Sequence, residues 1–145
     1  MPLVLEFKQG DKIIVNGAVL ENGGHPTQLV IHNDVAILRG KDILAEEHAV
    51  TPAARVYFAL QCAYIFPEKR ADYLAAFSDR LQEYITACPS AGSIADSIQR
   101  KLSDGVLYGA LRATRKLIDH EKKLLKDLGL AVEKPKAEPS SPRKR

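Results

Sequence analysis

Cysteine is scarce in this sequence, with two residues among 145, and tryptophan is absent. Small secreted folds held together by disulfides contain far more cysteine, so a disulfide scaffold is excluded. Cys62 and Cys88 stand apart from each other and belong to no CxxC pair of the kind that binds zinc or carries out redox chemistry. Both fall on apolar stripes, so we expect them to be small core side chains.

Long apolar runs are also missing. No stretch approaches the roughly 20 apolar residues that span a bilayer. Residues 1–8 have neither the charged nor the long apolar part of a secretory signal. We therefore expect a cytoplasmic protein that does not enter a membrane. Hydrophobic residues make up 46% of the chain and charged residues 27%, which suits one compact domain or two small lobes.

The motifs of common catalytic and metal sites are absent as well. The chain contains no GxSxG, GxxxxGK[ST] or GxGxxG pattern. No histidine is paired at helical spacing with another histidine or cysteine, as zinc ligands usually are. The histidines are His25, His32, His48 and His120. Glu46 and Glu47 are adjacent, but acids before a helix are usually solvated or favour the helix dipole. We therefore predict no enzymatic activity, no metal and no cofactor.

The first 50 residues have the pattern of short strands. Apolar and polar side chains alternate over residues 3–8, which predicts a half-buried strand, and Asn16-Gly17 predicts a tight hairpin. Short connections predict antiparallel neighbours throughout. The expected strands are residues 3–8, 12–15, 18–20, 28–32 and 35–39. Because this segment is short, it cannot enclose much core by itself. Its sheet must therefore pack against helices or against a second copy of itself.

The chain changes character at Thr51-Pro52, because threonine is a good N-cap and proline is well accepted in the first helical turn. A helix should run from residue 52 to about residue 65, where Pro67 ends it. Its side chains are apolar on most faces, so it should be the central helix. Apolar side chains at helical spacing predict three more helices before Gly129, which is a plausible C-terminal cap.

The predicted fold class is α+β. Residues 1–50 form a small antiparallel five-stranded sheet or barrel, residues 51–130 a bundle of about four helices, and residues 131–145 a disordered basic tail. Four bases against seven acids give residues 1–50 a charge of −3, and twelve against nine give residues 51–129 a charge of +3. Five against two give residues 130–145 another +3. A polyanionic partner would therefore meet its positive charge in the second half.

Two groups of basic residues could contact such a partner. The group near one edge of the sheet consists of Lys8, Arg39 and Lys41. The group on the fourth helix, opposite the leucines, consists of Arg112, Arg115, Lys122 and Lys126. A stripe of this kind can neutralise phosphates. The alternative is an ordinary solvated helix face, which composition alone favours.

Three segments carry a family signature when they are taken together. They are Met1-Pro2-Leu3 with Gly10-Asp11-Lys12-Ile13-Ile14-Val15-Asn16-Gly17-Ala18-Val19, then Val35-Ala36-Ile37-Leu38-Arg39 with Lys41-Asp42-Ile43-Leu44, and Thr51-Pro52-Ala53-Ala54-Arg55-Val56-Tyr57-Phe58. In this order and spacing the chain resembles the FlbT family of flagellar biosynthesis repressors, as far as about Leu128. Where a basic pair is expected after Thr-Pro-Ala, this chain has Ala54-Arg55, so any role of that pair falls on Arg55.

The resemblance implies a post-transcriptional repressor of flagellin synthesis. Such a protein binds the 5′ untranslated region of flagellin mRNA and promotes degradation of the transcript while no flagellum is being built. The resemblance implies no catalytic residues, so nucleases of the cell would degrade the RNA. It also implies a functional partnership with the flagellar regulator FlaF.

Within the first half, residues 3–5, 10–13 and 39–43 are similar to the first and last strands of the CsrA family of mRNA-binding regulators. That resemblance implies homo-oligomerisation through the β-rich lobe and contact of unpaired RNA with an arginine of the last strand, here Arg39. The first strand of the CsrA family carries more basic residues than the first strand of this chain, where Lys8 is the nearby base. The alternative for Arg39 is a surface ion pair with an acid such as Asp42.

The candidate RNA-binding residues are Lys8, Arg39, Lys41, Arg55, Tyr57, Arg112 and Arg115. Unpaired RNA is read by arginine and aromatic planes, which is why Tyr57 joins the bases in this set. The alternative function is a protein-interaction module whose leucine-rich helices bind a flagellar regulatory partner or flagellin. Its effect on mRNA would then be indirect.

Overall fold

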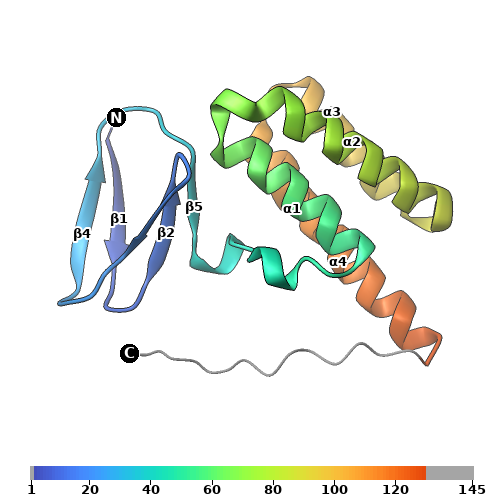
Figure 1. Cartoon of the computed structure of the whole chain (residues 1–145), viewed down its shortest axis with the longest axis horizontal. Helices are drawn as coiled ribbons and strands as arrows, with labels where there is room; N and C mark the ends of the chain where they lie inside the picture. Colours follow the sequence, from blue (N-terminus) through green and yellow to red (C-terminus); the bar gives the residue numbers. More distant parts are fainter. Residues whose placement is uncertain (1, 130–145) are drawn as a thin grey trace. The chain divides into compact units, whose positions relative to one another are not determined.

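The structure is a computed structural model that describes residues 2–129. It consists of two compact units, a β unit up to Ile43 and a helical unit from Leu44 onward (Figure 1). The division comes earlier than the boundary that we predict at residues 50/51. The reason is Gln61, whose side-chain amide exchanges two hydrogen bonds of 2.8 Å with the backbone N–H and carbonyl of Leu44.

The strands of the β unit are β1 (Leu3–Phe7), β2 (Lys12–Val15), β3 (Ala18–Glu21), β4 (Thr27–Ile31) and β5 (Ile37–Arg39). All their pairings are antiparallel, as the short connections predict. The strands form two sheets, with β1 beside β4 and β2 between β3 and β5. The chain turns away from β1 at Gly10, where φ is 85° and the N–H donates to the carbonyl of Asn22. The predicted α+β class is confirmed, with the five strands divided between two sheets.

The predicted hairpin between β2 and β3 is confirmed. Asn16 and Gly17 have φ values of 49° and 90°, the positive pair that a tight primed turn requires. Asn16 also holds the approach to β5, because its Oδ1 accepts the N–H of Ala36 at 2.8 Å. The buried side chains of the β unit are Leu5, Phe7, Ile13, Ile14, Ala36 and Leu38. This is a small core.

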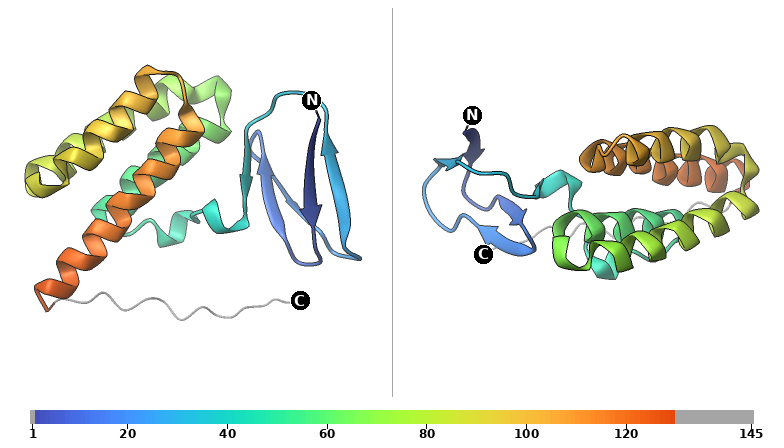
Figure 2. Two further views of the ribbon diagram at one scale, coloured as in Figure 1. Left: turned by 180° about the vertical axis from the view of Figure 1, so that it is seen from behind. Right: turned by 90° about the horizontal axis from the view of Figure 1, so that it is seen from above.

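The helices are α1 (Pro52–Ile65), α2 (Arg70–Ala87), α3 (Gly92–Ser103) and α4 (Leu107–Asp127), as the apolar periodicity predicts. Short 3₁₀ turns are η1 (Gly40–Asp42), η2 (Glu46–His48), η3 (Pro67–Lys69) and η4 (Pro89–Ala91). The right-hand view of Figure 2 shows two layers, α1 with α2 and α3 with α4. α1 packs against both α2 and α4, so it is the central helix that the sequence predicts.

The start of α1 has an acceptor for each amide of its first turn. The N–H of Ala54 donates to Thr51 Oγ1 at 3.2 Å, which confirms the predicted N-cap. Pro52 has no N–H to satisfy. The N–H of Ala53 donates to Oε2 of Glu121, a buried carboxylate on α4. The helix start is therefore completed from a distant part of the chain.

The helix ends also follow the predicted signals. α1 ends before Pro67, and Arg70 Nε donates to the Ala63 carbonyl at 2.9 Å. Gly129 has a φ of 74° and its N–H donates to the carbonyl of Lys126, as expected of a C-terminal cap. The predicted disordered tail, residues 131–145, lies outside the described residues. No described helix is long and apolar enough to cross a membrane.

Candidate nucleic-acid interface

Six basic residues of α4 lie in one sector of the helix. At about 100° per residue their positions cover about 120° of its circumference. We call this set the basic stripe: Arg112, Arg115, Lys116, Lys122, Lys123 and Lys126. None of them is buried, whereas Ala110 and Leu117 on the opposite side enter the core. Asp119 falls within the same sector and Asp127 beside it, and both are exposed. Six bases against these two acids still leave this side of the helix with a positive excess.

An exposed tyrosine stands at the start of the basic stripe. Tyr108 is 37% exposed, and Cζ of Arg112 lies 5.9 Å from the centroid of its ring. Tyr64 of α1 supports the same ring, with 5.7 Å between the two centroids. Our sequence reasoning missed both tyrosines, although the i, i+4 spacing of Tyr108 and Arg112 on one helix indicates their contact.

Tyr57 orients Arg115. Cζ of Arg115 lies 4.8 Å from the Tyr57 ring centroid, and its Nη2 donates to Tyr57 Oη at 3.3 Å. Tyr57 is 1% exposed, so a nucleobase cannot stack on its ring in this structure. We therefore leave Tyr57 out of the interface proposed below and keep Arg115, which it positions.

Arg55 faces another part of the helical unit. It lies two positions before Tyr57, which is about 200° around α1. There it lines a cavity of about 360 Å³ with Arg80 of α2 and with Leu124 and Leu125 of α4. The structure thus places Tyr57 in contact with Arg115, with Arg112 three positions before it on α4. Arg55 lies on a different side of α1, in a cavity that the end of α4 helps to line.

The predicted bases of the β unit are all exposed. Arg39 on β5 reaches the other sheet, where its Nη2 donates to the backbone carbonyl of Glu6 on β1 at 3.2 Å. Arg39 thus contacts the main chain of Glu6, on a strand of the other sheet. Lys8 follows β1, and Lys41 lies in η1. These residues belong to the β unit, whereas the basic stripe belongs to the helical unit.

A hydrogen-bonded chain that the sequence did not reveal links α2 and η4 to α4. His120 Nδ1 lies 2.9 Å from Tyr84 Oη, and His120 Nε2 lies 2.9 Å from Ser90 Oγ. A neutral imidazole can accept one of these bonds and donate the other. Burial, with smaller effects of Cys88 and Glu121, raises the pKa of Tyr84 well above its ordinary value. The phenol therefore keeps its proton, and can keep its hydrogen bond, at alkaline pH where an ordinary tyrosine begins to ionise.

The cysteines are not paired with each other. Cys62 is buried, as predicted, and burial raises the pKa of its thiol from 9.0 to about 11, with Glu46 adding to the shift. Cys88 is partly exposed, so the prediction that it is a core side chain is wrong, because it lies at the C-cap of α2, where the helix ends. Among residues 2–129, no group of three or more histidine, cysteine, aspartate or glutamate side chains is arranged to hold a metal ion.

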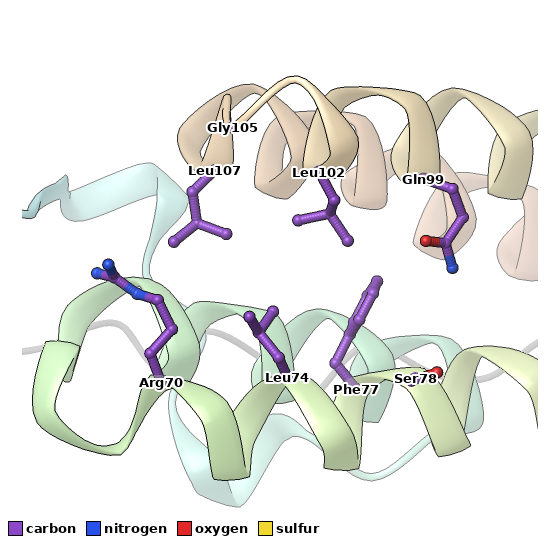
Figure 3. A pocket seen from close by; sticks show the side chains of 8 residues that line it. All are labelled: Arg70, Leu74, Phe77, Ser78, Gln99, Leu102, Gly105 and Leu107. Carbon is purple, nitrogen blue, oxygen red and sulfur yellow. The ribbon is translucent and has the colours of Figure 1, made fainter.

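A second concave surface lies between α2 and α3. It is a groove of about 410 Å³, and Figure 3 shows side chains of both walls pointing into it. Leu74 and Phe77 come from α2, and Leu102 of α3 and Leu107 of α4 face them. Arg70 stands at one end of the groove. The surface is mainly apolar and shares no residue with the basic stripe.

Comparison with known proteins gives a consistent answer. Residues 3–125 match the profile of the family described as flagellar protein FlbT. The probable flagellum biosynthesis repressor protein FlbT 1 of Bradyrhizobium diazoefficiens is 38% identical over 125 residues, which cover 86% of this chain and 85% of that protein. The probable repressor protein FlbT of Caulobacter sp. is 35% identical over 123 residues, 83% of this chain and 94% of that protein.

A third relative is the flagellum biosynthesis repressor protein FlbT of Caulobacter vibrioides. It is 33% identical over 123 residues, which cover 83% of this chain and 87% of that protein. No solved structure matches the chain significantly. The family match runs from β1 into the last turns of α4, so it includes both units and most of the basic stripe. The chain therefore belongs to the FlbT family of flagellar proteins.

Proposed function

We propose that this protein represses flagellin synthesis after transcription, by binding the 5′ untranslated region of flagellin mRNA and promoting degradation of the transcript. The names of its relatives, flagellum biosynthesis repressors, support a role in repressing flagellum formation. The observation that carries direct RNA binding is the basic stripe of α4, with the exposed Tyr108 at its start. Nucleases of the cell would then cleave the bound transcript.

The basic stripe suits a flexible single strand. From Arg112 to Lys126 it extends about 21 Å at 1.5 Å per residue, enough to meet several consecutive phosphates. Each phosphate that a base neutralises releases counterions, so binding weakens as salt rises. Tyr108 and Arg112 add planar groups on which an unpaired base can stack. The site therefore favours unpaired RNA.

The β unit would add to this function. Arg39, with Lys8 and Lys41 in the same unit, offers a second group of exposed cations. We also propose homo-oligomerisation through the β unit, because large apolar side chains remain exposed on its strands. These are Leu3, Val4, Val19, Leu20 and Val30. FlaF is the proposed protein partner in the same regulation.

Titration of a labelled flagellin leader RNA at several salt concentrations tests the proposal. The double variant Lys122→Gln, Lys126→Gln should bind more weakly, and the slope of log K against log salt should fall by about 0.7 for each phosphate that is no longer neutralised. The matched control is Lys69→Gln, Arg100→Gln, which removes two exposed charges from other helices. Equal weakening in both double variants, or no affinity in the unmodified chain, would show that α4 is not an RNA site.

A second candidate function is a protein-interaction module with an indirect effect on mRNA. The groove between α2 and α3 favours it, because partly exposed leucines line both of its walls. The occupant would be FlaF, flagellin or another flagellar protein. This function predicts a stable complex with a partner protein and no affinity for leader RNA by the purified chain.

A further inference from the structure

We propose that the groove between α2 and α3 binds an amphipathic helix of a partner protein, with apolar side chains between Leu74 and Leu102 and an acidic residue at Arg70. The basic stripe of α4 takes no part in this surface. The inference therefore stands whether or not the protein binds RNA.

The helical unit is incompletely packed between α2 and α3. α1 packs against α2 and α4, and α3 packs against α4, but α2 and α3 hardly pack against each other (Figure 2). Phe77 lines the groove on the α2 side and is 1% exposed. Leu74, Leu102 and Leu107, which also line it, are only partly buried. Covering these three leucines would remove apolar surface from water, which favours an apolar occupant.

The exposed surface of α2 is divided into an uncharged side and a charged side. The side next to the groove carries Ala71, Ala75, Ser78 and Gln82, spaced i, i+4, i+7 and i+11. The other side carries Asp72, Asp79, Arg80 and Glu83. Charged residues are depleted at the centres of protein interfaces, and small side chains let two helices approach closely. The uncharged side therefore extends the docking surface beyond the groove.

The groove favours a helical occupant over an extended one. The groove walls are helices, whose backbone groups are bonded internally and offer no strand edge. A buried extended segment would leave its own amides and carbonyls unpaired, whereas a helix satisfies them itself. The lining on α2 runs from Arg70 to Ser78, a length of about 12 Å or two helical turns. Anchors at i, i+3, i+4 and i+7 of a partner helix fit this length.

The groove carries a positive charge. Within residues 2–129, Arg70 is the one charged side chain that lines the groove, so a carboxylate on the occupant would complement it. A single cation is too little for RNA, whose binding depends on several phosphate contacts. The described helical unit offers no continuous apolar helix face for a second copy's groove. Its exposed large apolar residues are scattered, namely Val50, Val106, Tyr108 and Leu128.

The full chain can be titrated by calorimetry with a capped synthetic helix that carries leucines at i, i+3, i+4 and i+7 and a glutamate at one end. Ala75→Arg places a long charged side chain on the uncharged side of α2 and should weaken binding at least tenfold. Ala76→Arg makes the same change one residue away, on the charged side, and should keep affinity within about twofold. Both alanines are exposed, so both variants should fold.

A twin peptide with lysine in place of glutamate tests the role of Arg70. It should bind the unmodified chain more weakly, and this difference should shrink in Arg70→Gln. No binding of the glutamate peptide, or equal binding by Ala75→Arg and the unmodified chain, overturns the proposal. Self-association that Ala75→Arg abolishes would identify a second copy as the occupant and overturn it too.

The same variants can be titrated with the flagellin leader RNA. Ala75→Arg should bind the RNA as the unmodified chain does. If that variant loses RNA affinity, the groove is an RNA surface and the assignment to a partner helix is wrong. If no variant binds RNA while the peptide results hold, the proposed RNA function fails and the docking site stands.

Discussion

Glu121 is the residue that completes a helix to which it does not belong. Its Oε2 accepts the N–H of Ala53 at 3.1 Å, 68 positions earlier in the sequence, and the carboxylate is 8% exposed. Without Glu121, the buried N–H of Ala53, which follows Pro52 in the first turn of α1, would have no acceptor. A polar residue on the core side of α4 is therefore explained by the start of α1.

Glu121→Ala should lower the free energy of unfolding by about 1–3 kcal/mol, because it leaves a buried donor unsatisfied. Glu121→Gln keeps an acceptor oxygen and should lose less. Urea denaturation followed by circular dichroism measures both, with the exposed Glu83→Ala as control. A loss in Glu121→Ala no larger than in Glu83→Ala would mean that Ala53 finds another acceptor.

The cysteines should differ in their reaction with iodoacetamide under native conditions. The thiolate is the reactive form, and burial both shields Cys62 and raises its pKa to about 11. Cys88, partly exposed, should label first at pH 8, and labelling of Cys62 should increase only as the pH approaches 11. Peptide mass mapping at a series of pH values measures this order. Equal labelling rates at pH 8 would show that the helical unit opens readily around Cys62.

The raised thiol pKa also links Cys62 to alkaline unfolding. Between pH 9 and pH 11 the Cys62 thiol keeps its proton in the folded state, whereas in the unfolded chain it has lost it. The contribution of this thiol to the free energy of unfolding is therefore complete below pH 9 and declines as the pH rises towards 11. Between these values the free energy of unfolding should fall less steeply in Cys62→Ala. Urea titrations at several pH values compare the two slopes, and identical slopes would contradict the assignment.

At the scale of elements, the β2–β3 hairpin depends on one glycine. Gly17 has a φ of 90°, a backbone conformation that residues other than glycine rarely adopt. Gly17→Ala should destabilise β2 and β3 by at least about 1 kcal/mol, seen as faster amide hydrogen exchange in both strands. Gly23→Ala is the control, because no atom lies within 4 Å of the added Cβ. Similar exchange in the two variants would show that the turn tolerates a side chain.

The elements were predicted unequally well from the sequence. Helix α1 follows the signals Thr51, Pro52 and Pro67 from start to end, because caps and prolines act locally. Strand β5 begins at Ile37, later than the predicted residue 35. The amide of Ala36 is taken by the side chain of Asn16, so this part of the chain belongs to the turn contact. Strand limits depend on distant partners, which a local pattern does not contain.

At the scale of the whole molecule, the placement of charge matters more than its total. The chain carries a net charge of +3, and residues 130–145 alone contribute five bases against two acids. Deleting them removes more net charge than the Lys122→Gln, Lys126→Gln double variant does. If the basic stripe is the RNA site, the double variant should nevertheless lose more affinity for leader RNA. Anisotropy titrations at one salt concentration compare the two, and the opposite order would assign binding to the tail.

The sequence by itself determined the α+β class, the order of strands and helices, the β2–β3 hairpin, the ends of α1 and the family. It also placed the bases of α4 on one face, because helical periodicity relates neighbours in the chain. Only the tertiary structure decided that Tyr57 is buried beneath Arg115 and that Arg55 faces a different cavity. It also decided that Glu121 caps α1, and that α2 and α3 leave a groove between them. These features depend on side chains that lie dozens of residues apart and meet only when the helices pack.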